Sequence, residues 1–386
     1  MSRVAVVGIG HSRFGRRTDV NIGELAFESI KQAVDDAGVD RKDIRNVVIG
    51  NMGGWSQESL PAVVVDEYAG LSGAGTMRVE AACASGSAAV KSAYNCIKSG
   101  EGELAMAVGV EKMTEVDSST TVELIGRAGS YAWEFENFGM TFPAYYALHA
   151  VAHMSKFGTT EEDMARVAVK AHHYGAMNPL AQFQKEITLE KALGSQVIAW
   201  PLKLYDACPL TDGSAAVVLA SEEVAKKLTD SPIWIRGIGS SSDSANLSRR
   251  GSYVGLEAAV RAARAAYSIA KVAPDDIDVA DVHDCFTIAE LMAYEDLGFC
   301  KKGEGAKMIR EGQTELGGKI PVNLDGGLKA KGHPVGATGV SMVVEITKQL
   351  RGEAGKHQAP IRKGVGLVHN IGGTGHYAYI TVLGRD

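Results

Sequence analysis

Cys83 is the first residue of this sequence whose type and setting suggest chemistry. It lies among small residues, within the run from Glu80 to Ser87, at the point where a helical pattern begins. The positive end of a helix dipole lowers the pKa of a thiol placed there, which favours the nucleophilic thiolate. Small neighbours would also let an acyl chain approach. Buried cysteines with purely structural roles are about as common, so Cys83 needs a partner before it is assigned to catalysis.

A histidine that could be this partner lies in a glycine-rich loop, residues 326–339. The loop places His333 just before a second helical pattern, which opens with Gly336-Ala337-Thr338-Gly339 much as the first opens with Cys83-Ala84-Ser85-Gly86. A neighbouring imidazole is the usual means of activating a sulfur nucleophile. We therefore expect His333 and Cys83 to approach each other.

Two further groups of polar residues directly follow predicted strands. The segment from His283 to Phe286 follows the apolar run 279–282, and the segment from His369 to Gly375 follows the run 365–368. Successive glycines in the second segment can turn backbone N–H groups toward an oxyanion. We expect both segments to lie with His333 at a junction between two halves of the chain.

Two other patterns favour structural interpretations. Gly8-Ile9-Gly10 resembles the start of a dinucleotide-binding loop, but Arg13 stands where the third glycine belongs, and the pattern returns at Gly237-Ile238-Gly239 as a structural turn would. His149 and His153 share one face of a predicted helix, yet Ala150 replaces the glutamate of the zinc-binding H-E-x-x-H pattern. We expect the two histidines to be a packed or surface pair, with no cofactor or metal site.

The elements that must position these residues alternate short β-branched runs with longer helical patterns, which is typical of an α/β fold. The run from Ile233 to Gly239 echoes the run from Val4 to Gly10, and a helix and a strand follow both. The sequence therefore predicts two similar halves, residues 1–230 and 231–386, with a site between them that draws loops from both. Residues from about 113 to 205 have no counterpart in the second half and predict an inserted loop domain.

Composition narrows the class of protein. The chain has 386 residues and a net charge of −6, which argues against a broad surface for nucleic acid. No apolar run approaches the ~20 residues of a membrane helix, and the first residues lack the apolar core of a signal peptide. The five cysteines show no paired short spacings, which favours a reducing compartment. We expect a cytoplasmic protein that binds neither membrane nor nucleic acid.

Together, the four groups of residues make the chain resemble the thiolase superfamily over essentially its whole length. The most specific motif is the loop around His333, Gly332-His333-Pro334 with Gly336-Ala337-Thr338-Gly339. The runs Asp212-Gly213-Ser214-Ala215-Ala216 and Gly139-Met140-Thr141 add to it. The resemblance implies the thiolase fold, in which two similar α/β halves form a five-layer αβαβα arrangement and the loop domain is inserted into the first half.

Two departures point to a subgroup of this superfamily. The segment from His283 to Phe286 replaces the Asn-Glu-Ala-Phe of bacterial biosynthetic and degradative thiolases. Asn370 stands where those enzymes carry a second catalytic cysteine. Both features are similar to sterol carrier protein x-type and archaeal thiolases.

For this subgroup the resemblance implies a two-cysteine mechanism that needs no cofactor or metal. Cys83 would accept the acyl group while His333 supports its thiolate, and Cys285 would remove the α-proton of a second thioester. His283 would join His333 in holding the enolate oxygen, through a water molecule. The backbone N–H groups of Cys83 and Gly372 would form a second oxyanion hole.

The implied activity is that of an acetyl-CoA C-acetyltransferase, an acetoacetyl-CoA thiolase that joins two acetyl-CoA molecules reversibly. The alternatives are a degradative 3-ketoacyl-CoA thiolase and a steroid side-chain lyase of the sterol carrier protein x type. Ketoacyl synthases share the fold and use a cysteine with two histidines, but Cys285 and the loop around His333 favour a thiolase. A CoA-binding scaffold without catalysis is disfavoured because all four candidate side chains are present.

The resemblance also implies partners. Acetyl-CoA, acetoacetyl-CoA and CoA would be the small-molecule ligands, and members of the family are homodimers or homotetramers. The resembled archaeal enzymes supply 3-hydroxy-3-methylglutaryl-CoA synthase in the mevalonate pathway. They associate with that synthase through a small zinc-ribbon/OB-fold protein, and the same complex is expected here.

Overall fold

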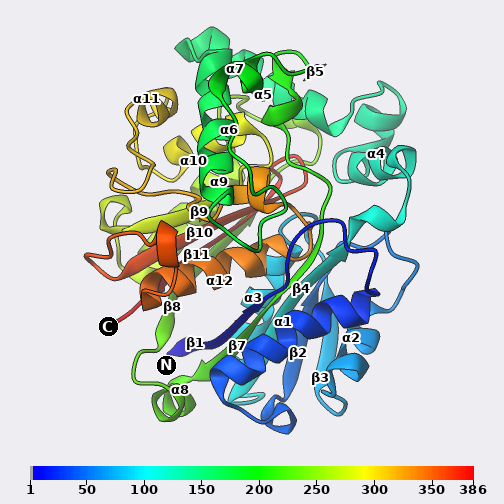
Figure 1. Ribbon diagram of the computed structural model, residues 1–386, viewed down its shortest axis with the longest axis vertical. Coiled ribbons are helices and arrows are strands. Elements are labelled where there is room, and N and C mark those ends of the chain that lie inside the picture. The colour runs from blue at the N-terminus through cyan, green and yellow to red at the C-terminus, as the bar shows by residue number, and fades with distance from the viewer. Residues whose placement is uncertain (1–2) are drawn as a thin grey trace.

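A nine-stranded sheet forms the centre of the protein, in the order β3-β2-β4-β7-β1-β8-β11-β10-β9. The computed structural model describes residues 3–386 (Figure 1). Helices cover and separate the strands, which confirms the predicted α/β class. The strands of this sheet are β1 (Val4–His11), β2 (Asn46–Gly50), β3 (Gly75–Val79), β4 (Leu104–Lys112), β7 (Asp212–Ser221), β8 (Ile233–Ser242), β9 (Val279–Val282), β10 (Val365–Gly372) and β11 (Tyr377–Gly384).

The sheet has two parts with the same internal order. They meet where β1 pairs with β8, and this seam holds only the register pairs Ala5 with Trp234 and Val6 with Ile233. Away from the seam, each part continues with two antiparallel pairings and then a parallel one, through β7, β4 and β2 on one side and β11, β10 and β9 on the other. The predicted boundary at residue 230 falls between the end of α8 and the start of β8. The division into domains there stays a prediction.

The helices form three layers around these two parts. α1 packs on β1 and β7, α9 packs on β8 and β11, and α3 and α12 lie between the two parts of the sheet (Figure 1). This is the αβαβα order that the resemblance implies. The α-helices are α1 (Ile22–Ala37), α2 (Pro61–Ala69), α3 (Ser85–Ser99), α4 (Ser118–Gly126), α5 (Phe142–Phe157), α6 (Glu161–Gly175), α7 (Leu189–Leu193), α8 (Glu222–Leu228), α9 (Glu257–Ala270), α10 (Thr287–Asp296), α11 (Gly305–Arg310) and α12 (Thr338–Arg351).

The repeated Gly-x-Gly patterns lie inside strands, at places where a helix backbone touches the sheet. A Cβ atom added to Gly10 would lie 1.9 Å from the backbone oxygen of Ser29 in α1, and one added to Gly239 would lie 2.0 Å from that of Ala262 in α9. Only glycine permits so close an approach. These glycines therefore serve helix packing, rather than the turn that we predicted.

Between β4 and β7 the chain forms a separate lobe of helices α4 to α7, with a small hairpin of β5 (Val197–Ala199) and β6 (Leu202–Lys203). Thr160 and Asp163 form a reciprocal capping box at the start of α6. Among residues 3–386, no helix is both long and apolar enough to cross a bilayer.

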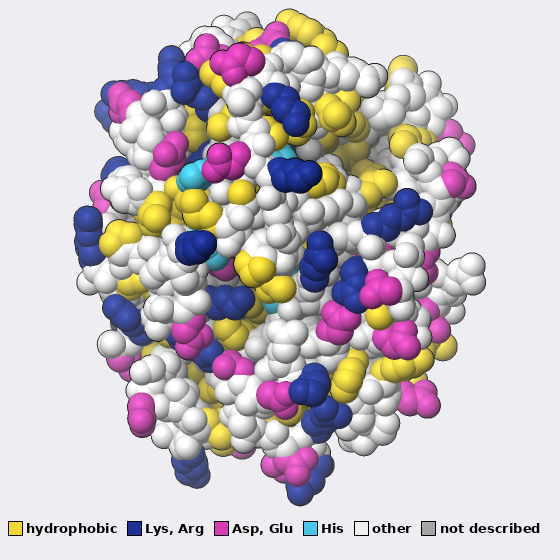
Figure 2. All heavy atoms as spheres, in the orientation of Figure 1, with side chains coloured by type: hydrophobic (Ala, Val, Ile, Leu, Met, Phe, Trp, Pro, Cys, Tyr) yellow, Lys and Arg dark blue, Asp and Glu magenta, His cyan; other side chains and the backbone are white. Residues whose placement is uncertain are grey.

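One face of the molecule is shown in Figure 2, where basic and acidic side chains are interspersed and no broad basic surface is seen. Apolar side chains line a hollow on this face, in the region of α5 and α4.

Candidate active site

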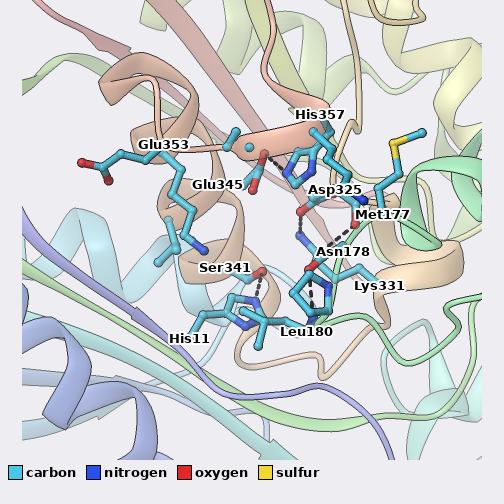
Figure 3. A pocket seen from close by; sticks show the side chains of 16 residues that line it. His11, Met177, Asn178, Leu180, Asp325, Lys331, Ser341, Glu345, Glu353 and His357 are labelled. Atoms are coloured by element: carbon cyan, nitrogen blue, oxygen red, sulfur yellow. Dashed lines mark hydrogen bonds and ion pairs between the residues drawn. The ribbon is translucent and has the colours of Figure 1, made fainter.

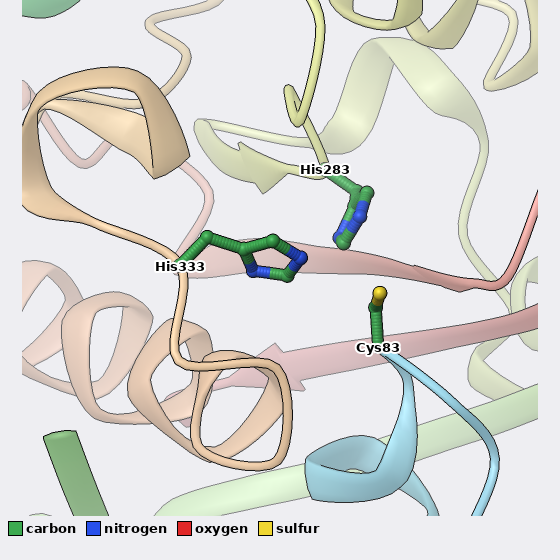
Figure 4. Close-up of side chains that lie close together, drawn as sticks. All are labelled: Cys83, His283 and His333. Carbon is green, nitrogen blue, oxygen red and sulfur yellow. The ribbon is translucent and has the colours of Figure 1, made fainter. Parts of the chain in front are cut away.

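Three side chains from distant parts of the chain converge at the junction between the two parts of the sheet (Figure 4). Cys83 precedes α3, His283 follows β9, and His333 lies in the loop before α12. One sulfur or nitrogen atom from each lies within 4.8 Å of the other two, and all three residues are buried. The imidazole centroids of the two histidines are 4.9 Å apart, with the rings nearly perpendicular at 82°. In the described chain this is also the cluster with the spacing to hold a metal ion.

Cys83 lies in a strained turn between β3 and α3. Ala82 adopts a φ of 50°, in the left-handed region that non-glycine residues seldom enter. The Ser85 hydroxyl braces the turn, because it accepts a hydrogen bond from the Ala81 N–H at 2.9 Å and donates one to the Ala82 carbonyl at 2.6 Å. The turn fixes the thiol two residues ahead of the first residue of α3.

The predicted lowering of the Cys83 pKa is wrong for the protein without substrate. Burial raises the pKa of this thiol to about 12, the nearby Cys208 thiol adds to the rise, and the Gly373 backbone N–H opposes it. The free-energy cost of removing the Cys83 thiolate from water exceeds the stabilisation that the N-terminus of one helix gives it. Cys83 is therefore a neutral thiol at neutral pH, and it needs a base.

His333 has the protonation state that such a base requires. Its Nδ1 lies 2.7 Å from the Thr338 hydroxyl oxygen, and that hydroxyl donates its own hydrogen to the Pro334 carbonyl at 3.0 Å. Thr338 can then only accept from Nδ1–H, so Nε2 carries the lone pair. Nε2 has no hydrogen-bond partner in the protein. Burial lowers the pKa of His333 to about 3, with a further contribution from Lys331, so the ring is neutral.

The loop that carries His333 is anchored from behind by buried ion pairs (Figure 3). The Lys331 ammonium pairs with Asp325 and lies 3.6 Å from Asp281, and both partners raise the pKa of this lysine against the effect of burial. Asn178 of the inserted lobe donates to the Asp325 carbonyl at 2.8 Å. Asn178, Asp325 and Lys331 border a cavity of about 230 Å³. The loop is thereby tied to the core by buried side chains.

His283 is held at the end of β9. Its backbone N–H donates to Nδ1 of His369 at 3.2 Å, and its ring Nδ1 lies 3.2 Å from the side-chain nitrogen of Asn370. Burial keeps the pKa of His283 well below its ordinary value, and the neighbouring His333 and His369 lower it further. The ring is therefore neutral.

Cys285 is buried two residues before the start of α10 and two residues beyond His283. Burial raises its pKa well above the ordinary value, the Cys208 and Cys83 thiols add to this, and the Tyr146 hydroxyl opposes it. The Cys208 backbone N–H donates to the Cys285 carbonyl at 3.0 Å, which ties the end of the inserted lobe to this turn. A thiol with so high a pKa gives a strongly basic thiolate once it is deprotonated.

Gly372 closes β10 beside the turn that holds Cys83. A Cβ atom added to Gly372 would lie 2.1 Å from the Ala81 carbonyl oxygen, so glycine alone fits there. The next residue, Gly373, is the one whose backbone N–H faces the Cys83 sulfur. Sequence reasoning singled out Gly372 and missed Gly373, and the oxyanion role of Gly372 stays a prediction.

A larger cavity of about 620 Å³ opens beside Cys208, and sequence reasoning did not find it. Most of the surface that lines it is apolar, four of the lining residues are Lys or Arg, and none is acidic: Arg13, Lys185, Lys191 and Lys329. Lys329 is buried and its ammonium has no hydrogen-bond partner in the protein. The cavity therefore suits a long ligand that is partly apolar and carries negative charge.

His149 and His153 are packed in the interior, which is one of the two alternatives, packed or surface, that we expected. Both are fully buried, and their rings bond to different partners, His149 to the Tyr253 carbonyl at 2.7 Å and His153 to Thr159 and Glu295.

Comparison with known proteins identifies this arrangement. The chain matches the thiolase N-terminal domain over residues 4–223 and the thiolase C-terminal domain-like family over residues 239–385. It is 42% identical to an acetyl-CoA acetyltransferase of Methanothermobacter thermautotrophicus over 388 aligned residues, which cover 100% of both chains. It is 35% identical to bovine sterol carrier protein 2, over 96% of this chain and 70% of that protein.

A solved structure agrees with these sequence matches. The Ltp2-ChsH2(DUF35) aldolase aligns with a TM-score of 0.87 at 27% identity, over 100% of this chain and 98% of that chain. Full-length similarity to named acyltransferases, together with the two domain matches, leads to one conclusion: this chain is an acyltransferase that belongs to the thiolase family.

Proposed function

We propose that this protein is an acetoacetyl-CoA thiolase, which reversibly condenses two molecules of acetyl-CoA through an acetyl group carried on Cys83. The observation that carries this proposal is the convergence of one thiol and two neutral imidazoles within 4.8 Å, in a buried site that a mostly apolar, cation-lined cavity adjoins. The named function of the relative at 42% identity supports the choice of acetyl-CoA as substrate.

In the first half-reaction, the Cys83 thiol gives its proton to Nε2 of His333 as the sulfur attacks the thioester carbonyl carbon. The backbone N–H groups of Cys83 and Gly372 hold the carbonyl oxygen, which becomes negative. The carbon–sulfur bond to CoA breaks, and the CoA thiolate takes the proton of Cys285. Acetyl-Cys83, protonated His333 and the Cys285 thiolate remain, and the charge of His333 stabilises that thiolate.

In the second half-reaction, the Cys285 thiolate removes a proton from the methyl carbon of a second acetyl-CoA. His333 and His283 hold the resulting enolate oxygen, through a water molecule, and the carbon attacks acetyl-Cys83. The bond between Cys83 and the acetyl carbon breaks, and the Cys83 sulfur recovers its proton from His333. Acetoacetyl-CoA leaves, and every group has returned to its starting state.

The cavity beside Cys208 would admit the CoA arm. Its apolar lining suits the pantetheine chain, and its lysines and arginine suit the phosphates. This use of the cavity fits its place next to Cys285, the base of the second half-reaction.

Thiolysis tests the proposal most directly. Purified protein is incubated with acetoacetyl-CoA and CoA, and acetyl-CoA is measured by liquid chromatography. We expect two acetyl-CoA for each acetoacetyl-CoA consumed with the wild type and none with Cys83→Ala. Absence of acetyl-CoA with the wild type would exclude this substrate, and unchanged turnover by Cys83→Ala would exclude the nucleophile.

A second candidate is cleavage of a larger β-keto or β-hydroxy acyl-CoA. It is favoured by the fold similarity to an aldolase at a TM-score of 0.87 and by the match to sterol carrier protein 2. The two reactions are distinguished by a series of 3-ketoacyl-CoA of increasing chain length together with a steroid side-chain thioester. A kcat/KM that is highest for acetoacetyl-CoA supports the leading proposal.

The remaining expectations concern setting and partners. We propose a cytoplasmic homodimer or homotetramer whose product feeds a 3-hydroxy-3-methylglutaryl-CoA synthase of the mevalonate pathway. We further propose that a small zinc-ribbon/OB-fold protein joins the two enzymes, and the naming of the similar aldolase as an assembly of Ltp2 with ChsH2(DUF35) supports a small partner. Size-exclusion chromatography of the three proteins expressed together tests this complex.

A further inference from the structure

Asn370 bridges two members of the site through one end of its side chain. It lies fully buried in β10, and its side-chain nitrogen is 3.1 Å from the Cys83 carbonyl oxygen and 3.2 Å from Nδ1 of His283. A backbone carbonyl can only accept a hydrogen bond, so the amide must turn its NH₂ group toward Cys83. The same NH₂ group supplies the second hydrogen, which faces His283. The Cys83 carbonyl thus fixes the orientation of the amide, and this orientation directs an amide N–H toward Nδ1 of His283.

The consequence falls on the proton of His283. Because Nδ1 faces an amide N–H, it must be the accepting nitrogen, and the ring hydrogen of the neutral imidazole resides on Nε2. The protonated ring would place two hydrogens against each other at the Asn370 contact. The titratable groups that act on the charge of His283 are His333 and His369, the Cys83 thiol lies within 4.8 Å of it, and each of these three is neutral. None of them supplies a negative charge that would favour protonation of the ring.

The other end of the Asn370 side chain supports a role beyond packing. Its oxygen is buried without a hydrogen-bond partner. A buried polar atom without a partner is costly, and such atoms in native proteins call for an explanation. An apolar residue of the same size would avoid the unpaired oxygen but would lose both hydrogens of the NH₂ group.

We propose that Asn370 is a positioning residue that fixes His283 as an Nε2–H donor and ties it to the backbone of Cys83. The two imidazoles then differ in character, since His333 presents a lone pair to the thiol and His283 presents an N–H. The use of this N–H to hold the enolate oxygen rests on the proposed function, whereas the tautomer does not. With its hydrogen on Nε2, the neutral His283 ring has no lone pair on that nitrogen for a metal ion.

Nitrogen NMR of the full-length wild type tests the tautomer without any substrate. The protein is labelled with ¹⁵N in its histidine rings, and the His283 signals are identified by their loss in His283→Asn. We expect a non-protonated Nδ1 and a protonated Nε2 throughout the neutral range. A protonated Nδ1 would overturn the proposal, whatever the activity of the protein is.

Kinetics of Asn370→Asp, with Asn370→Ala as the matched control, test the positioning role. The introduced carboxylate accepts from His283, moves the ring hydrogen to Nδ1 and removes the donor, so kcat should fall roughly 100-fold while KM changes little. As pH falls and the carboxyl gains a proton, it can donate again, and kcat should recover toward the wild type. Asn370→Ala should lose activity at every pH, without such recovery.

Two outcomes of this experiment would overturn the proposal. One is a pH profile of Asn370→Asp parallel to that of the wild type, which is what a merely structural role predicts. The other is unchanged kcat in Asn370→Ala. If the wild type has no thiolase activity, the proposed function fails while the NMR result still decides the tautomer.

Discussion

At the scale of single residues, burial controls the reactivity of Cys83. The pKa of this thiol is about 12 and that of His333 is about 3, so neither is charged at neutral pH. The thiolate fraction of Cys83 therefore grows with pH through the whole alkaline range. We expect alkylation by iodoacetamide to accelerate about tenfold for each pH unit above neutrality, as a single deprotonation requires.

This rate is measured by mass spectrometry of the peptide that contains Cys83, with Cys83→Ala as the blank. A plateau that begins below about pH 8 would instead show a preformed thiolate–imidazolium pair, of the kind found at low-pKa cysteines.

Thr338 is a residue whose importance lies in one hydrogen bond. Its hydroxyl accepts from His333 Nδ1–H at 2.7 Å. Thr338→Val keeps the shape and removes this acceptor, so the His333 ring loses its fixed tautomer. We expect kcat/KM for thiolysis to fall roughly 10- to 100-fold, as for other groups that orient a functional histidine. Thr338→Ser keeps the hydroxyl and should retain most of the activity, and full activity in Thr338→Val would contradict the role.

The residue types at the site could be predicted from the sequence, but their protonation states could not. The pattern around Cys83 suggested a lowered pKa because a helix start is visible in the sequence, whereas full burial by residues far along the chain is not. In the same way, the glycine-rich loop indicated His333, but the hydrogen-bond direction at Thr338 depends on the Pro334 carbonyl. Charge and hydrogen-bond direction are properties of the packed environment, and a motif leaves them open.

At the scale of elements, the starts of α3 and α12 are packed backbone to backbone. A Cβ atom added to Gly86 would lie 2.8 Å from the Gly336 carbonyl oxygen and 2.8 Å from the Val340 nitrogen. Gly86→Ala should therefore push the two helices apart, and with them Cys83 and His333. We expect a loss of about 1–3 kcal/mol in the free energy of unfolding, from urea denaturation, and a larger loss of kcat.

The matched control for this change is Gly251→Ala, because a Cβ atom added to Gly251 meets nothing within 4 Å. It should leave both stability and activity close to the wild type. Equal behaviour of Gly86→Ala and Gly251→Ala would show that the close contact is not needed.

The repeat of elements in the two halves could largely be predicted from the sequence, because β1 and β8 carry similar sequences and each is followed by a helix and a strand. The function of Gly10 and Gly239 was not, because a helix backbone at 1.9–2.0 Å from an added Cβ leaves no trace in a local pattern beyond the glycine itself. The cavity beside Cys208 was missed for a related reason. Its lining comes from separated segments that no single motif contains.

At the scale of the whole molecule, β3 is an edge strand whose outer side pairs with no other strand of the described chain. Met77 in this strand is 42% exposed, and Val63 of the neighbouring α2 is 61% exposed. An exposed edge strand is a template for pairing with another chain, and covering it is one way in which proteins protect it. A second copy of the chain is the expected cover, in keeping with the proposed homodimer or homotetramer.

Met77→Lys should disrupt that interface by placing a charge on the exposed edge. We expect light scattering after size exclusion to give at least twice the 40.8 kDa chain mass for the wild type and a lower mass for this variant. Ile269→Lys, at a 57% exposed position on α9, is the matched control and should keep the wild-type mass. An unchanged mass for Met77→Lys would place the interface elsewhere.

The seam between β1 and β8 joins two parts that both contribute residues to the site, and the ribosome makes these parts one after the other. Cys83 is made 250 residues before His333 (333 − 83), and Asn370 is made later than His333. The burial that raises the Cys83 pKa depends on α12 packing against α3, so we expect the thiol of the unfinished chain to have a pKa closer to its ordinary value. A thiol in that state is more readily oxidised than one with a pKa of about 12. The unfinished chain, rather than the finished enzyme, is therefore the form most vulnerable to oxidants.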